Sequence, residues 1–205
     1  DDHEGHGTGM AGLAAYGDLT TLLDGQHQVV LTHWLESVKL LPRVGQNEPE
    51  HYGALTQAAM SKAELNAELH APGRRRVFAL AITATDAKDY CENGKPSAWS
   101  AALDSYAAGY LDDDEARRLV CVSAGNVPLS KGSDYPNLNE VTSIEDPAQS
   151  WNALTVGAFT ERDVVTDADG RLLEDSRPVA RKGGLCPASA TSVLWMSEGS
   201  RHWPI

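Results

Sequence analysis

The sequence DDHEGHGTGMAGLAAY, which spans Asp1–Tyr16, decides how the chain is organised. His6 is followed by the small and flexible residues Gly7–Gly9 and then by Met10–Ala15, a run dominated by good helix formers. This order predicts that His6 lies where a loop turns into a helix. A titratable imidazole would then be held on a rigid element.

A second informative stretch is RLVCVSAGN, which spans Arg118–Asn126 and joins a short apolar run to small residues and one amide. Its apolar part, Leu119–Ser123, predicts a buried strand. The run Val77–Ile82 is continuously apolar and bounded by breakers. It suits a strand that is buried on both faces, as in a parallel sheet.

The rest of the chain alternates between helix and strand patterns. The patterns predict helices over Met10–Leu23, His51–Leu69 and Ala98–Tyr110, and further strands over His27–Thr32, Ser37–Leu41 and Trp151–Phe159. Val127–Ser150 is a long, polar, turn-rich loop by its composition, and Glu161–Arg181 is typical of a hairpin or a surface excursion around Asp169-Gly170. The alternation predicts an α/β fold in three layers, with a mostly parallel sheet and helices on both faces.

Length and charge limit the classes of function. At 205 residues, with 41% apolar residues, the chain fits one domain with a sizeable core. Seventeen basic against twenty-nine acidic side chains give a net charge of −12, which disfavours a nucleic-acid or anionic-membrane partner. No apolar run reaches the roughly 18 to 20 residues that span a bilayer. The three widely spaced cysteines read as free thiols and slightly favour the cytoplasm, without excluding secretion.

Two other interpretations of the opening stretch start from its residues alone. Gly7–Gly12 matches the G-x-G-x-x-G pattern of dinucleotide-binding turns, but that pattern follows an apolar strand, and here acidic residues precede it. The acidic and histidine side chains of Asp1–His6 could also form a metal cluster, although their spacing matches no closed zinc pattern. We therefore assign no metal and no cofactor, while calcium remains possible.

Taken together, the two stretches resemble the subtilases, the subtilisin-like serine proteases. The family's block His-Gly-Thr-x-x-Ala-Gly is matched by His6–Gly12, and its small-small-Gly-Asn segment is matched by Ser123–Asn126. The resemblance implies that His6 is the general base and that the Asn126 amide donates to the oxyanion of the tetrahedral intermediate. It implies a peptide or protein substrate.

The resemblance also implies where that substrate binds. Val77–Thr83 resembles the strand whose open edge pairs with an extended peptide, so that backbone hydrogen bonds provide affinity. Two walls of the primary pocket follow from it, one formed by Ala81, Ile82 and Thr83 and the other by Ser123, Ala124 and Gly125. The family usually has Ser-Leu-Gly where this chain has Ala81–Thr83, so the shape of the pocket differs.

Two parts of the catalytic machinery are missing from the sequence. Asp1 and Asp2 stand too close to His6 to be the strand-borne aspartate, and no Gly-Thr-Ser-x-Ala or Gly-x-Ser-x-Gly block carries a nucleophile. We therefore expect residues 1–205 to form a single partial subtilisin-like domain, incomplete at both ends and inactive alone. It should self-associate through exposed sheet faces. A noncatalytic peptide-binding module of the same fold, or a nucleotide-binding domain, are the alternatives.

Overall fold

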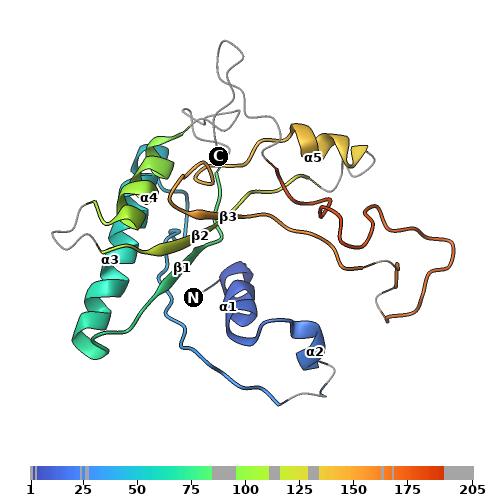
Figure 1. Ribbon diagram of the computed structural model, residues 1–205, viewed down its shortest axis with the longest axis horizontal. Coiled ribbons are helices and arrows are strands. Elements are labelled where there is room, and N and C mark those ends of the chain that lie inside the picture. The colour runs from blue at the N-terminus through green and yellow to red at the C-terminus, as the bar shows by residue number, and fades with distance from the viewer. Residues whose placement is uncertain are drawn as a thin grey trace, which may run out of the picture.

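Three parallel strands form the centre of the computed structural model, which describes residues 2, 4–23, 25, 28–84, 96–110, 116–128, 134–162, 164–167 and 169–191. The strands β1 (Val77–Leu80), β2 (Leu119–Ser123) and β3 (Leu154–Val156) lie side by side in the order β1-β2-β3 (Figure 1). Both pairings are parallel. The α/β class and the parallel sheet are therefore confirmed.

Two helices cover one face of this sheet. They are α3 (Tyr52–His70), preceded by the short 3-10 helix η1 (Pro49–His51), and α4 (Ala98–Ala108). Ser97 and Ser100 form a capping box that fixes the start of α4. α3 and α4 pack closely because Gly53 has no side chain: a Cβ there would lie 2.8 Å from the Cβ of Ala102. Both helices confirm the sequence predictions.

The hydrophobic core lies between these helices and the sheet. Leu103, Val120 and Val122 are at most 1% exposed. Trp99 is also buried, and its indole N–H donates to the Thr56 hydroxyl at 2.9 Å. The prediction that the first strand is buried on both faces is wrong, because Val77 is 64% exposed at the open edge of the sheet.

The helices α1 (His6–Tyr16) and α2 (Leu19–Leu23) lie on the other side of β1 from α3 and α4 (Figure 1). The single helix expected over Met10–Leu23 is wrong: the structure has α1 (His6–Tyr16) and α2 (Leu19–Leu23). α1 ends because Gly17 adopts φ +72°, a left-handed value that favours glycine, and its N–H donates to the Leu13 carbonyl.

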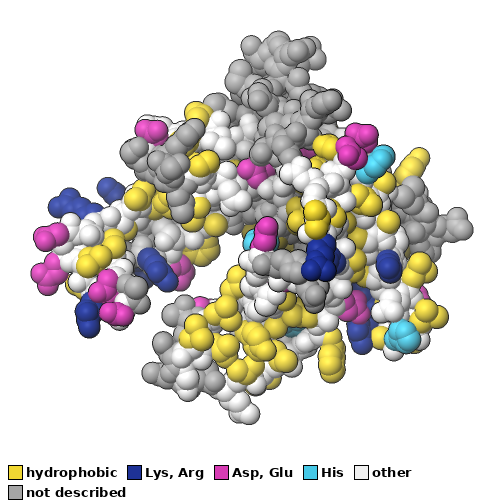
Figure 2. All heavy atoms as spheres, turned by 180° about the vertical axis from the view of Figure 1, so that it is seen from behind, with side chains coloured by type: hydrophobic (Ala, Val, Ile, Leu, Met, Phe, Trp, Pro, Cys, Tyr) yellow, Lys and Arg dark blue, Asp and Glu magenta, His cyan; other side chains and the backbone are white. Residues whose placement is uncertain are grey.

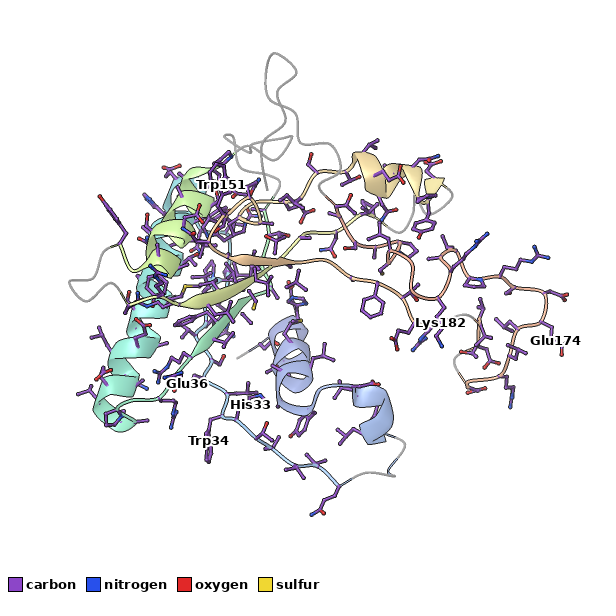
Figure 3. The ribbon with its side chains drawn as sticks, viewed as in Figure 1. His33, Trp34, Glu36, Trp151, Glu174 and Lys182 are labelled. Atoms are coloured by element: carbon purple, nitrogen blue, oxygen red, sulfur yellow. The ribbon has the colours of Figure 1, made fainter. Side chains whose placement is uncertain are left out.

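No strand forms over residues 28–32 or over Ser37–Leu41, so these two predictions are wrong; residues 26–27 lie outside the description. A strand needs a neighbouring strand to pair with its backbone groups, and neither segment pairs with one among the described residues. Side chains between these two segments attach the chain to the rest of the molecule instead (Figure 3). His33 donates to the Ala14 carbonyl at 2.7 Å, and Glu36 accepts from Arg74 and Arg76.

Exposed apolar side chains gather on this part of the molecule. Val30 is 71% exposed and Trp34 83% exposed, and α1 adds Leu13 and Tyr16. Figure 2 shows hydrophobic side chains collected on the face seen from behind. Within the described residues, no helix is both long enough and apolar enough to span a bilayer.

The chain after β2 is less loop-like than predicted. It contains α5 (Asn137–Val141), and Ile144, Asp146 and Ala148 are buried, so Val127–Ser150 is in part core. The hairpin predicted around Asp169-Gly170 is confirmed by an antiparallel bridge between Thr166 and Leu172.

Candidate active site

His6 is the first residue of α1 and follows Gly5, whose φ of +78° turns the chain into the helix. The Gly9 N–H donates to the Gly5 carbonyl at 2.9 Å, which closes the first turn. The prediction that His6 lies where a loop becomes a helix is confirmed. Its imidazole is fixed by the helix start rather than by a mobile loop.

Asp2 fills the amino end of the same helix. Its carboxylate accepts from the Thr8 N–H at 2.6 Å and from the Gly5 N–H at 3.0 Å. The hydrogen bond from Thr8 is the main reason why the pKa of Asp2 lies below its ordinary value. A pyrophosphate would need these same N–H groups, and Gly7–Gly12 is entirely helical, so the structure argues against the nucleotide interpretation.

A metal cluster was the other interpretation of the opening stretch. Among the residues that the structure describes, no three histidine, cysteine or acidic side chains come together as metal ligands. Asp1 and His3 lie outside that part of the chain. Two described carboxylates precede His6, those of Asp2 and Glu4, and the Asp2 carboxylate is already bound to the helix start.

The His6 ring reaches the carboxyl end of β1. Its Nε2 lies 3.1 Å from the carbonyl oxygen of Ala81, the residue directly after the strand. A carbonyl only accepts, so Nε2 carries the proton in this contact. The imidazole is exposed on its other sides.

Asn126 follows β2 at the same edge of the sheet. Its backbone is fixed from both sides, because the Val127 N–H donates to the Ala188 carbonyl and the Ala190 N–H donates to the Gly125 carbonyl. The Asn139 side chain supports that segment through the carbonyls of Cys186, Pro187 and Ser189. The Asn126 side chain is exposed, and no hydrogen bond engages its amide among the described residues.

The two predicted pocket walls also lie at this edge. Leu80 is level with Val122 in the parallel register, so Ala81–Thr83 and Ser123–Asn126 leave the sheet in the same direction. Ala81, Ile82, Thr83 and Ser123 are half-buried. Ala124 and Gly125 are buried, and the Ala124 backbone is fully bonded, to Val156 and to Glu145. The carboxyl edge of parallel strands is the usual place for a ligand.

Comparison with known proteins shows to which family the chain belongs. The model of the Subtilase family matches residues 1–205. The chain belongs to the subtilase family. Searches among curated proteins and among solved structures give no match. The resemblance seen in the sequence is thus confirmed, and the chain is a subtilisin-like member of a family of serine proteases.

Sequence reasoning missed one residue at the carboxyl edge of the sheet. The Glu145 carboxylate accepts a hydrogen bond from the Thr83 hydroxyl, and the Glu145 N–H donates to the Ala124 carbonyl at 2.9 Å. Glu145 therefore joins the ends of β1 and β2. In the sequence, Glu145 is only one acidic residue within a long loop. That pattern does not indicate that it lies between the ends of β1 and β2.

The neighbouring acid, Asp146, has a structural role in the subtilase chain. It is buried, its carboxylate accepts from the Ser97 hydroxyl, and its carbonyl accepts from the Ala84 N–H at 3.0 Å. Burial raises the pKa of Asp146, and the Ser97 hydrogen bond partly opposes this. These contacts anchor the loop between β2 and β3 against the start of α4.

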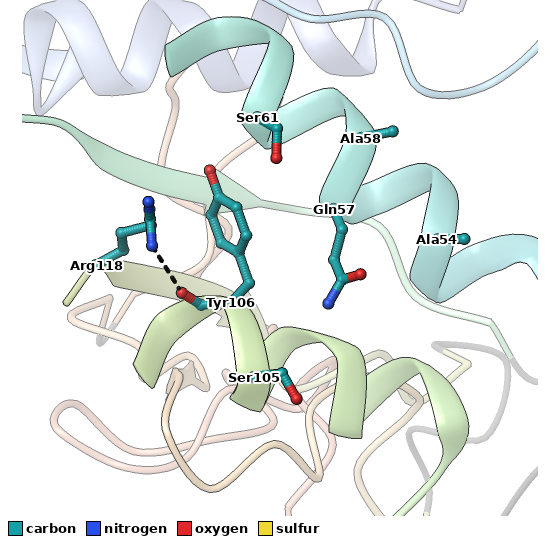
Figure 4. Close-up of a pocket in the computed structure, with 7 residues that line it drawn as sticks. All are labelled: Ala54, Gln57, Ala58, Ser61, Ser105, Tyr106 and Arg118. Atoms are coloured by element: carbon teal, nitrogen blue, oxygen red, sulfur yellow. Dashed lines mark hydrogen bonds between the residues drawn. The ribbon is translucent and has the colours of Figure 1, made fainter. Parts of the chain in front are cut away.

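A cavity of about 230 Å³ lies elsewhere, between α3 and α4 (Figure 4). Arg118 contributes to its lining, together with Ala54, Gln57, Ala58, Ser61, Ser105 and Tyr106. The Arg118 guanidinium bonds to Glu64 at 2.7 Å and lies over the Tyr106 ring at 4.5 Å. Arg118 precedes β2, so this cavity belongs to the amino edge of the sheet, away from His6 and Asn126.

Proposed function

We propose that this chain carries the general base and the oxyanion donor of a subtilisin-like serine endopeptidase. The main support is the contact between His6 Nε2 and the Ala81 carbonyl, because it brings the imidazole to the sheet edge from which Asn126 also projects. These two side chains come from distant parts of the sequence. A shared edge is what a common substrate would require.

The chemistry assigns one role to each. His6 takes the proton of a serine hydroxyl as that oxygen attacks the peptide carbonyl, and then gives it to the leaving amine. The Asn126 amide donates to the oxyanion that forms on the carbonyl oxygen. Such a donor stabilises the transition state by roughly 3 to 4 kcal/mol, a magnitude established for subtilisin itself and not obtained from this geometry. The proposed reaction uses no cofactor.

The substrate would lie between the two short segments that leave the sheet. In this proposal Ala81, Ile82 and Thr83 border one side of the peptide, and Ser123, Ala124 and Gly125 border the other. The outer edge of β1 supports it, because no strand pairs with that edge among the described residues. An extended peptide could satisfy the open backbone groups.

We further propose that residues 1–205 alone do not hydrolyse peptides. The sequence has no block typical of the nucleophile, and the aspartates near His6 are too close to act as its orienting partner. The tautomer agrees with this: a ring that donates from Nε2 to Ala81 cannot also accept a serine proton there. An aspartate at Nδ1 would reverse the tautomer, as in other triads.

The test is peptide hydrolysis by the protein expressed from its complete reading frame. His6→Ala should abolish turnover, and Asn126→Ala should lower kcat roughly 10²- to 10³-fold with little change in KM. His33→Ala is the matched control, because His33 is also exposed and also donates to a carbonyl, that of Ala14. Turnover that survives His6→Ala would contradict the proposal, as would turnover by the purified 205-residue chain.

A noncatalytic peptide-binding module of the same fold is the second candidate. The observation that favours it is the lack of a nucleophile block in the sequence. Peptide binding without turnover, from the complete reading frame, would select this candidate. The peptide site would be the same in both cases.

A further inference from the structure

The Glu145 side chain lies between the two proposed pocket walls. Its carboxylate oxygen Oε2 accepts from the hydroxyl of Thr83, on the wall that follows β1. On the other wall the Glu145 N–H donates to the Ala124 carbonyl. A carboxylate is therefore held where the two walls come together.

Gly125 shows how closely this side chain fits. A Cβ at Gly125 would lie 2.5 Å from Glu145 Cγ and 2.7 Å from Oε2, so only glycine admits the carboxylate here. The φ of Gly125 is +103°, which independently favours glycine. The second wall thus offers bare backbone to the acid, and the first wall offers a hydroxyl.

The charge of Glu145 has no counterpart in the described part of the chain. Glu36, Glu64 and Asp169 each pair with arginine, whereas Glu145 is half-buried and has no cation within ion-pair distance there. Among the described residues, the side chain of Glu145 has one hydrogen bond, from Thr83 to Oε2, and no donor reaches Oε1. A partly desolvated carboxylate with an open oxygen is suited to a cationic ligand.

We propose that Glu145 determines specificity by accepting the lysine or arginine side chain of a peptide substrate. This inference rests on the proposed function, because it names the substrate class of the same site. The cation would donate to Oε1 while Thr83 keeps Oε2 in place. The net charge of −12 adds long-range attraction for basic peptides.

Fluorescence anisotropy with the 205-residue chain tests this without any need for turnover. The probes are three labelled, end-blocked hexapeptides that differ at one residue: arginine, norleucine or glutamate. The arginine peptide should bind roughly tenfold more tightly than the norleucine peptide, the effect of one charge-assisted hydrogen bond. Glu145→Gln should remove this ratio by weakening the binding of the arginine peptide.

The Glu145→Gln variant should keep the fold, because a glutamine oxygen can still accept from the Thr83 hydroxyl. Glu140→Gln is the matched control: it removes the same charge from an exposed residue of α5 and should preserve the ratio. Glu145→Lys gives a second readout and should reverse the preference in favour of the glutamate peptide.

The outcomes separate the two proposals. Equal binding of the arginine and norleucine peptides, or an equal loss in Glu140→Gln, would overturn the role of Glu145 and leave the peptide site intact. Failure of all three peptides to bind would contradict the proposed function, and the assignment of Glu145 with it.

Discussion

Two apolar runs of this chain are almost the same in composition, but one forms a buried strand and the other is exposed. Val120 and Val122 in β2 are at most 1% exposed, between β1 and β3 and under α4, whereas Val29, Val30 and Leu31 are 46 to 71% exposed and form no strand. The difference is the presence of neighbours. A β-branched run becomes a strand when other strands satisfy its backbone, and apolar composition alone does not suffice.

The largest expected effect comes from the same substitution in both runs. Val122→Ala should lower the free energy of unfolding by about 2 to 3 kcal/mol, because it removes two buried methyl groups and leaves a cavity. Val30→Ala should change it by less than about 0.5 kcal/mol, because that side chain is already in water. Urea unfolding measures both. Similar losses would mean that residues 28–32 are as well packed as β2.

Two acids that follow these regions in the chain, Asp146 and Glu36, should contribute to stability with opposite dependence on pH. Burial raises the pKa of Asp146 above 3.8, so the folded chain binds this proton more tightly than the unfolded chain does. Its contribution to stability is complete below about pH 3.8 and is lost as the pH rises through the raised pKa. The free energy of unfolding of Asp146→Asn, relative to that of the natural chain, should therefore increase as the pH rises.

Glu36 supplies the opposite case, because its hydrogen bond from Arg76 holds the pKa of its carboxyl below 4.5. That contribution is present above about pH 4.5 and is lost as the pH falls through the lowered pKa. Glu36→Gln should thus matter least in acid. The measurement is the difference in unfolding free energy between each variant and the natural chain, taken between pH 3 and 7. If both differences changed with pH in the same direction, the prediction would be contradicted.

The smallest expected effect concerns the exposed region itself. We propose that the chain self-associates through the exposed apolar side chains of residues 29–34 and α1, because apolar surface is unfavourable in water. Sedimentation velocity should show a concentration-dependent rise in mass that Trp34→Ser weakens. Trp151→Ser is the control, since Trp151 is 57% exposed on another part of the chain (Figure 3). A monomer at all concentrations would contradict this.

Features with local causes were predictable from the sequence. The position of His6 follows from glycines and helix formers beside it, and the bounds of β2 coincide with its apolar run. The sheet edge shared by His6 and Asn126 came from the family resemblance together with the parallel topology. The strand predicted at Ser37–Leu41 failed because a pattern of side chains cannot supply a pairing partner.

Glu145 could not be found from the sequence for a related reason. Its position depends on how the connection from β2 to β3 returns to the sheet, and Ser97 and Ala84 set that return through Asp146. Both partners are distant in sequence. Only the tertiary structure shows that the acid next to Asp146 lies over Gly125 and beside Thr83.

The central claim is that one peptide contacts both His6 and Asn126 at the carboxyl edge of the sheet. Nuclear magnetic resonance of the chain, titrated with the arginine peptide, tests it through the His6 ring signals and the Asn126 carboxamide signals. Both should shift along one binding curve, while the Asn152 carboxamide, which bonds to Asp104, should not move. Shifts at Asn126 without any at His6, or at neither residue while the peptide binds, would contradict the account.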